Sequence, residues 1–335
     1  MQAAIYGLAG TEISPEERDF FRDADPAGFI LFRRNCESRD QMRRMTDGLR
    51  NIAGRPEAPI LIDQEGGRVA RMKPPEWPAF PCGEAFDRLY QLAPSSAIEA
   101  ARVNARALAL MLNEVGVNVD CLPMLDVRQP GASDIVGDRA LGAEPMQVAA
   151  LGRAILDGLH SAGVLGVVKH IPGHGRALAD SHHELPVVDA GEEELAVDLE
   201  PFERLRNAAM GMTSHLLYKQ WDPHRPASQS PIVIHDIIRQ RIGFDGFLMS
   251  DDIGMEALAG DHGKRAAACV AAGCDVALHC DGKIENMLSV AEAVPPLSQE
   301  AEARLSRAMA MTFTPEDGMD FAAAVEKRDA LLALA

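Results

Sequence analysis

A segment near the middle of the chain concentrates side chains that can exchange protons. Residues 169–183, Lys-His-Ile-Pro-Gly-His-Gly-Arg-Ala-Leu-Ala-Asp-Ser-His-His, hold four histidines, one lysine, one arginine and one aspartate. A proline and two glycines prevent a regular helix, so we expect a loop. The loop follows residues 164–168, an apolar run typical of a buried strand. Loops on a rigid scaffold often carry catalytic groups, and a solvated surface loop is the alternative.

Asp180 and His182 are separated by a single residue within this loop. In a turn the carboxylate can reach the imidazole, orient the ring and raise its basicity. A histidine with an ordinary pKa of about 6.5 could then both give and accept a proton near neutral pH. A simple turn with exposed histidines is the alternative.

Two further segments end apolar runs with charged residues. In Met249-Ser-Asp-Asp-Ile253 we expect Asp251 to project into a site and Asp252 to cap the next helix. The Asp251 carboxylate could attack an anomeric carbon, as in retaining glycosidases. In Asp63-Gln-Glu-Gly-Gly-Arg-Val-Ala-Arg71 the glycines permit a tight turn, while the aspartate and arginines suit binding of hydroxyls and a carboxylate. An internal salt bridge that shapes this loop is the alternative.

The histidines also raise the question of a zinc site. His170, His174, His182 and His183 could in principle bind zinc. However, Pro-Gly separates the first two, so they cannot share a helical face. Zinc-dependent barrel hydrolases usually present two histidines at the end of the first strand, and residues 3–8 contain none. The sequence therefore predicts no catalytic metal and no cofactor.

The elements that must position these groups alternate between two types. Eight short apolar runs are typical of strands: 3–8, 28–32, 59–63, 117–127, 164–170, 210–215, 246–251 and 275–280. Helical spacing of apolar residues occurs in 38–52, 98–115, 145–162, 192–209, 232–242 and 264–272. This alternation predicts one α/β domain over residues 1–335, a TIM-type (β/α)₈ barrel of regular or irregular form, with a helical tail from about residue 315. A doubly wound open sheet is the alternative, but no G-x-G-x-x-G follows the first strand.

Polar residues gather where the predicted strands end. In a barrel these carboxyl ends converge on one face, where active sites lie. The residues concerned are Asp63, Asp126, Lys169, His170, His215 and Asp251. Each one alone could cap a helix, but their recurrence favours a shared site.

Composition excludes several classes of function. The formal net charge is −17, which argues against general nucleic-acid binding and against an anchor for anionic lipid. The first residues do not form a signal peptide, and no apolar run is long enough to cross a membrane. The six cysteines form no C-x-x-C pair, which is consistent with a reducing cytoplasm.

Taken together, the quoted segments resemble glycoside hydrolase family 3. Residues 169–175, with Asp180-Ser-His182, resemble the family's K-H-F-P-G-H-G…D-S-H motif. Residues 63–71 are similar to its D-x-E-G-G-R-V-x-R motif. Further similar segments are 28–35, 117–126, 137–141 and 243–256, so the resemblance covers nearly the whole chain. It is to the single-domain β-N-acetylhexosaminidases of bacterial peptidoglycan recycling.

The resemblance implies a role for each matching residue. Asp251 would be the nucleophile that forms a glycosyl-enzyme, and His182, oriented by Asp180, would be the general acid/base. Substrate contacts would come from Asp63, Arg71, Arg139, Lys169 and His170. The chain departs from the family pattern at Leu141, Ile171 and Cys280.

The implied activity is that of a cytoplasmic, retaining β-N-acetylglucosaminidase without a cofactor. It would remove terminal GlcNAc from peptidoglycan fragments, GlcNAc–anhydroMurNAc with or without peptide. We expect a monomer whose partners are these small molecules rather than nucleic acid or membrane. A β-glucosidase or a phosphorolytic variant of the same barrel is the alternative. A metal-dependent barrel hydrolase and a non-catalytic sugar-binding barrel are less favoured.

Overall fold

The computed structural model describes residues 1–181, 183–315 and 317–335. Within these residues, eight parallel strands follow one another around a closed barrel, and the last pairs with the first. The predicted (β/α)₈ barrel is therefore confirmed. The barrel strands are β1 (Gln2–Gly7), β2 (Pro26–Leu31), β3 (Ile60–Ile62), β4 (Val119–Asp120), β5 (Leu165–Ile171), β7 (Met210–Thr213), β9 (Phe247–Asp252) and β10 (Val276–His279). A separate parallel pair joins β6 (Val187–Val188) to β8 (Leu217–Tyr218).

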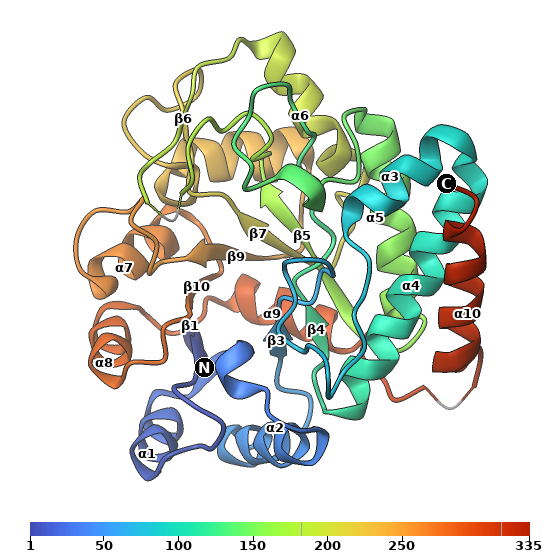
Figure 1. Ribbon diagram of the computed structural model, residues 1–335. Coiled ribbons are helices and arrows are strands. Elements are labelled where there is room, and N and C mark those ends of the chain that lie inside the picture. Colours follow the sequence, from blue (N-terminus) through green and yellow to red (C-terminus); the bar gives the residue numbers. More distant parts are fainter. Residues whose placement is uncertain (182, 316) are drawn as a thin grey trace.

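Helices surround the strands (Figure 1), with α1 and α2 at the bottom of the view, α7 and α8 on the left, and α4 and α5 on the right. The α-helices are α1 (Pro15–Ala24), α2 (Arg39–Ala53), α3 (Gly83–Leu92), α4 (Pro94–Glu114), α5 (Pro145–His160), α6 (Glu192–Arg204), α7 (His262–Ala272), α8 (Ile284–Ala293), α9 (Gln299–Met309) and α10 (Phe321–Leu332). A π-helix, η4 (Val233–Ile242), takes the place of the α-helix between β7 and β9. Short 3₁₀ helices are η1 (Arg33–Asn35), η2 (Gly137–Arg139) and η3 (Ala227–Gln229).

The interior of the barrel is a packed core. Inward-facing side chains such as Ile5, Leu61, Val167 and Phe247 form one buried apolar cluster. Alternate side chains of the same strands join a second cluster under the surrounding helices. Because both faces of each strand are buried, the strands are almost continuously apolar in sequence.

Helix α9 closes the end of the barrel where the strands begin. Leu297, just before this helix, and Leu305 and Met309 within it belong to the same apolar cluster as the barrel interior. Arg304 of α9 donates to Asp275, the residue before β10, at 2.9 Å. The barrel interior is therefore sealed at this end.

The fourth strand is much shorter than the predicted run of residues 117–127, because its ladder covers Val119–Asp120. Pro123 has no amide hydrogen to donate to a neighbouring strand. Beyond it, contact with β5 continues as an isolated bridge between Met124 and Lys169. Asp126 therefore lies on a connecting segment, beside His170 near the end of β5.

The prediction that Asp252 caps the next helix was wrong. Helix α7 begins at His262, and its N-cap is Asp261, whose side chain accepts from the Lys264 amide. Asp252 lies at the end of β9, well before this helix begins. Helices α1, α3 and α8 were not predicted, although Ser14 forms a capping box at the start of α1.

The chain ends in a helix that packs on the outside of the barrel. Helix α10 contacts α4 and α3. Arg106 of α4 donates to the carbonyl of Met319, just before α10, at 2.7 Å. The predicted helical tail thus contains a helix held by backbone-directed hydrogen bonds. In the part of the chain that the structure describes, every helix is too short or too polar to span a bilayer.

Candidate active site

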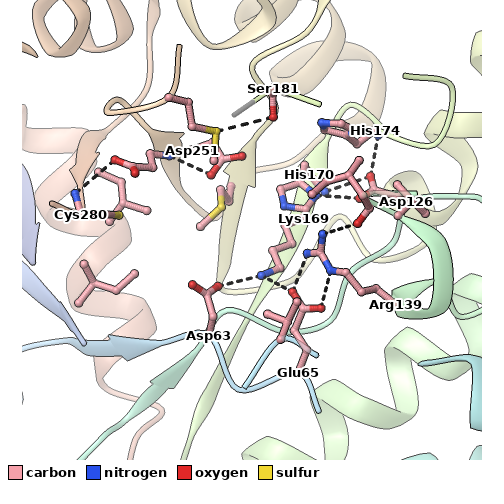
Figure 2. Close-up of a pocket in the computed structure, with 18 of the residues that line it drawn as sticks. Asp63, Glu65, Asp126, Arg139, Lys169, His170, His174, Ser181, Asp251 and Cys280 are labelled. Atoms are coloured by element: carbon pink, nitrogen blue, oxygen red, sulfur yellow. Dashed lines mark hydrogen bonds and ion pairs between the residues drawn. The ribbon is translucent and has the colours of Figure 1, made fainter. Parts of the chain in front are cut away.

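A cavity of about 240 Å³ opens at the carboxyl ends of the barrel strands. Six of the residues that the sequence analysis assigned to the site line it together: Asp63, Arg71, Arg139, Lys169, His170 and Asp251. Figure 2 shows five of these labelled around one space, together with Glu65, Asp126, His174, Ser181 and Cys280. They come from β5, β9 and the segments that follow the barrel strands, as expected of a barrel active site.

The floor of the pocket is a network of buried charges. Lys169 Nζ lies 3.0 Å from Asp63 Oδ1 and 2.7 Å from Glu65 Oε1. Arg139 binds Glu65 with two nitrogens, Nε at 2.9 Å and Nη2 at 2.7 Å. This paired geometry matches the planar fork of a guanidinium to a carboxylate and fixes both side chains. The internal salt bridge given as the alternative for this loop is also present, between Arg71 and Asp63, and both residues line the pocket.

Pairing keeps these groups ionised despite their burial. Burial alone raises the pKa of Asp63, but the charges of Lys169 and Arg71 outweigh it and lower that pKa to about 2. Burial likewise opposes ionisation of Glu65, but Arg139 and Lys169 hold its pKa below the ordinary value. Burial lowers the pKa of Lys169, yet the two carboxylates raise it overall. Near neutral pH the network therefore presents fixed charges, which suit binding of hydroxyl groups.

The turn that carries Asp63 depends on two glycines. Gly66 and Gly67 have φ angles of 102° and 54°, in the region that favours glycine. A Cβ atom on Gly66 would lie 2.1 Å from the carbonyl oxygen of Pro81. The tight turn expected from the sequence is therefore present, and it packs the Gly66 backbone closely against Pro81.

Arg71 forms the side of the pocket. Its Nη2 donates to Asp63 Oδ2 at 3.0 Å, and its guanidinium lies 5.1 Å from the centre of the Phe32 ring. Its buried Nε has no hydrogen-bond partner among the described residues. Since a buried donor without a partner costs free energy, a ligand oxygen that accepts from Nε would be favoured.

Asp126 organises the histidines on the opposite wall. Its Oδ2 lies 2.7 Å from His170 Nδ1, and its Oδ1 accepts from the backbone amides of His170 and His174 at 3.2 and 2.6 Å. This contact fixes the His170 ring and leaves Nε2 as the ring atom available to a ligand. Burial lowers the pKa of His174 to about 4, so its imidazole is neutral near neutral pH.

Asp251 lies at the end of β9 with its carboxylate in the pocket (Figure 2). Burial raises its pKa, but His170, His215 and the amide of Asp252 lower it overall. The Asp252 amide donates to Asp251 Oδ1 at 2.8 Å. Asp251 is thus an ionised carboxylate held in one orientation, as a nucleophile requires.

The neighbouring Asp252 has a different environment. Burial raises its pKa to about 6. Its Oδ1 accepts from the amides of Gly254 at 2.9 Å and Cys280 at 3.2 Å. These bonds tie the segment after β9 to the end of β10, where Cys280 lines the pocket.

The predicted Asp180–His182 pair is only partly within the described structure. His182 lies outside the described residues. Asp180 lies in the loop after β5, and its carbonyl accepts from the amides of His183 and Glu184. Next to it, the Ser181 carbonyl accepts from the Ala257 amide at 3.2 Å, which holds the loop beside the segment after β9. Ser181 of this loop lines the same pocket as Asp251.

Several pocket residues were not assigned to the sugar site from the sequence. Glu65 lies within the quoted segment 63–71, where its place between Asp63 and two glycines could have indicated it. His174 was considered only as a zinc ligand, and Phe32 lies in segment 28–35, which was used for the family resemblance and given no role in the site. Each lines the same cavity as Asp251.

Residues 3–311 match the glycosyl hydrolase family 3 N-terminal domain. The chain belongs to glycosyl hydrolase family 3. A family member named beta-hexosaminidase from Methylococcus capsulatus is 38% identical over 301 residues, which cover 87% of this chain and 86% of the relative. The crystal structure of native NagZ from Neisseria gonorrhoeae is 31% identical with a TM-score of 0.88, and the match covers 99% of this chain and 98% of that one. A structure of NagZ in complex with N-trifluoroacetyl-D-glucosamine is 30% identical with a TM-score of 0.85, covering 99% and 96%.

The family predicted from the motifs is therefore confirmed, and this family 3 member is a glycoside hydrolase. The match begins in β1 and ends just after α9, so it spans the barrel and the helix that seals it. The roles of individual pocket residues follow from their motif positions and stay predictions.

Proposed function

We propose that this chain is a retaining β-N-acetylglucosaminidase that acts through a covalent glycosyl-enzyme on Asp251. The observation that carries the proposal is an ionised Asp251 opposite a network of fixed charges, Asp63, Lys169 and Arg71, in one cavity. A nucleophile needs a sugar held in register with it, and such a network can hold ring hydroxyls. Relatives named beta-hexosaminidase, and NagZ in complex with N-trifluoroacetyl-D-glucosamine, support a 2-acetamido sugar as the ligand.

In the proposed reaction, an Asp251 oxygen attacks the anomeric carbon while the glycosidic C–O bond breaks. His182 gives its proton to the departing oxygen, so that a neutral alcohol leaves. Water then gives a proton to His182 and attacks the same carbon, which breaks the ester to Asp251 and restores both residues. Asp180 orients His182 throughout. Because each step inverts the anomeric centre, the product keeps the β configuration.

The proposed substrate is a peptidoglycan fragment with terminal GlcNAc, GlcNAc–anhydroMurNAc with or without peptide. The support is the resemblance of the chain to enzymes of peptidoglycan recycling. We propose that the protein acts as a monomer in the cytoplasm on these small molecules, without nucleic acid or membrane. All six cysteines are free thiols, which suits a reducing compartment.

A panel of chromogenic β-glycosides that differ only at C2 tests the activity, with each assay run with and without phosphate. We expect the 2-acetamido sugar to be cleaved with the highest kcat/KM and phosphate to leave the rate unchanged. Preference for a 2-hydroxyl sugar would identify a β-glucosidase. Acceleration by phosphate, with a sugar phosphate as product, would identify a phosphorolytic enzyme. No turnover of any glycoside by folded protein would leave a sugar-binding barrel.

A further inference from the structure

A second cluster of chemically reactive side chains lies outside the sugar pocket, where β10 ends beside the start of α7. It consists of His262, His279 and Asp281, whose potential ligand atoms all lie within 4.8 Å of one another. Among the residues that the structure describes, it is the group of three in which histidine and carboxylate side chains converge in this way. We propose that these three residues bind a divalent first-row metal ion, with zinc as the best fit.

The distances within the cluster suit ligands of one ion. His279 Nε2 lies 3.0 Å from His262 Nδ1 and 3.3 Å from Asp281 Oδ1. Ligands about 2.0–2.2 Å from a tetrahedral zinc ion are separated by roughly 3.3–3.5 Å. Small shifts of the His262 and Asp281 side chains, both half-buried, would therefore admit the ion.

Hydrogen bonding alone satisfies the cluster poorly. A neutral His279 carries at most one proton on Nε2, yet that atom faces both a carboxylate and a second imidazole nitrogen. Whichever imidazole nitrogen carries the proton, that proton can satisfy only one of these two contacts. A metal ion among the three atoms would accept a lone pair from each instead. His279 Nδ1 is buried without a hydrogen-bond partner among the described residues.

Supporting contacts and nearby charges also bear on cation binding. The Asp281 oxygens accept from the Lys283 amide at 2.8 Å and from Asn286 Nδ2 at 2.6 Å. These bonds orient the carboxylate as supporting contacts do in metal sites. Arg34, which donates to the neighbouring Cys280 carbonyl, is the nearby positive charge that opposes binding.

The donor set selects the kind of metal. Two imidazoles and one carboxylate suit zinc, nickel or cobalt, whereas magnesium and calcium prefer oxygen ligands throughout. Water would complete the coordination, because His262 and Asp281 are reached from solvent. The His279 ring packs against Tyr6 outside the barrel, while Leu278 and Cys280 on either side of it line the sugar pocket. The metal would therefore lie behind the pocket wall and outside the sugar site.

Titration calorimetry of the chelator-treated protein with ZnCl₂ tests the proposal. We expect one saturable equivalent, and a rise in Tm of about 3–5 °C when free zinc is about 100 times Kd. His262→Ala and Asp281→Asn should each weaken binding at least about tenfold. His235→Ala is a matched control, since His235 is an exposed histidine paired with Asp236 at 2.7 Å. Its zinc affinity should equal that of the unchanged protein.

Two further measurements separate this site from others. Asp251→Asn removes a carboxylate of the sugar pocket and should leave zinc binding unchanged. Cobalt should give the intense visible absorption of tetrahedral coordination, which His262→Gln, a variant that preserves side-chain bulk, should abolish. Zinc binding that survives His262→Ala and Asp281→Asn, that is lost in Asp251→Asn, or that is absent in the unchanged protein would overturn the proposal.

Discussion

Asp251 is ionised because two opposite effects act on it unequally. Burial disfavours the charged carboxylate, while His170, His215 and the Asp252 amide favour it. A backbone amide costs no reorganisation when the carboxylate attacks, so the orientation is prepared in advance. The reactivity of the proposed nucleophile thus depends on neighbours that the fold supplies from β5, β9 and the segment after β7.

Asp251→Asn should reduce kcat by about 10³-fold or more, because the amide cannot form the covalent intermediate. Sugar binding and Tm should change little, since the asparagine oxygen can still accept from the Asp252 amide. Steady-state kinetics and titration with GlcNAc measure both effects. The nucleophile assignment would be wrong if this variant kept near-native kcat.

Asp252 is a pocket carboxyl that could exchange a proton with substrate, because burial raises its pKa to about 6. However, its Oδ1 already accepts from two amides, so we expect a positioning role. Asp252→Asn preserves an acceptor oxygen and should keep kcat within about threefold.

His182→Ala should instead slow the cleavage of substrates with poor leaving groups by about 10²–10⁴-fold, and that of substrates with activated aryl leaving groups less. Kinetics with leaving groups of graded pKa distinguish the two residues, and the reverse pattern would assign the acid role to Asp252.

At this scale the sequence was informative where a charged residue interrupts an apolar run. Asp63, Lys169 and Asp251 stood out because each directly follows buried strand residues. Glu65 did not, because its partners Arg139 and Lys169 lie 74 and 104 positions away in sequence. Ion pairs between distant segments depend on the closed barrel, which spacing along the chain does not reveal.

The loop after β5 is held to the barrel at several points. Arg176 Nε donates to Asp198 Oδ2 of α6 at 2.6 Å, and its Nη2 donates to the Glu194 carbonyl at 3.0 Å. The Ala177 carbonyl accepts from the Ser133 amide at 2.8 Å. These contacts lie a few residues before Asp180, so they fix the position of the loop segment that leads to the proposed acid/base.

Arg176→Ala should loosen this loop and lower kcat by about 10–100-fold, since small misplacement of a catalytic group is costly. Limited proteolysis within residues 171–186 should become faster, and saturating GlcNAc should restore part of the protection. Arg204→Ala is a control, because Arg204 forms an exposed pair with Glu200 on the same helix. Equal kinetics and proteolysis in both variants would show that the Arg176 contacts do not position the loop.

Elements were predicted where periodicity was strong and missed where it was weak. All eight barrel strands were identified, because burial on both faces leaves an apolar run. The length of β4 was overestimated, because apolar residues continue past Pro123 although the strand ends at Asp120. The N-cap of α7 was assigned to Asp252 instead of Asp261, because both aspartates precede the helix. In the structure Asp261 caps the helix, while the Asp252 carboxylate accepts from the Gly254 amide at the pocket.

Stability of the whole molecule should fall as the pH is lowered below neutral. His174 is neutral in the folded protein because burial lowers its pKa to about 4, whereas an unfolded chain takes up a proton near 6.5. Since the unfolded state binds more protons, this stabilisation is present above pH 6.5 and is lost as the pH falls toward 4. The loss is about 3 kcal/mol for this side chain.

Urea unfolding of the unchanged protein and of His174→Asn at several pH values measures this effect. The free energy of unfolding of the variant should depend less steeply on pH between about 6.5 and 4. An exposed histidine variant, His235→Ala, should keep the full dependence. Identical curves for all three proteins would contradict a neutral, buried His174.

The seal formed by α9 has a kinetic consequence. With one end of the barrel closed, substrate and both products use the same opening, and the sugar held deepest cannot pass the remainder of the fragment. The fragment should therefore leave first and GlcNAc last. Free GlcNAc should accordingly compete with substrate for the empty enzyme, while the released fragment should inhibit with a mixed pattern. We therefore predict that the enzyme removes one sugar per encounter and releases both products before it binds the next substrate molecule.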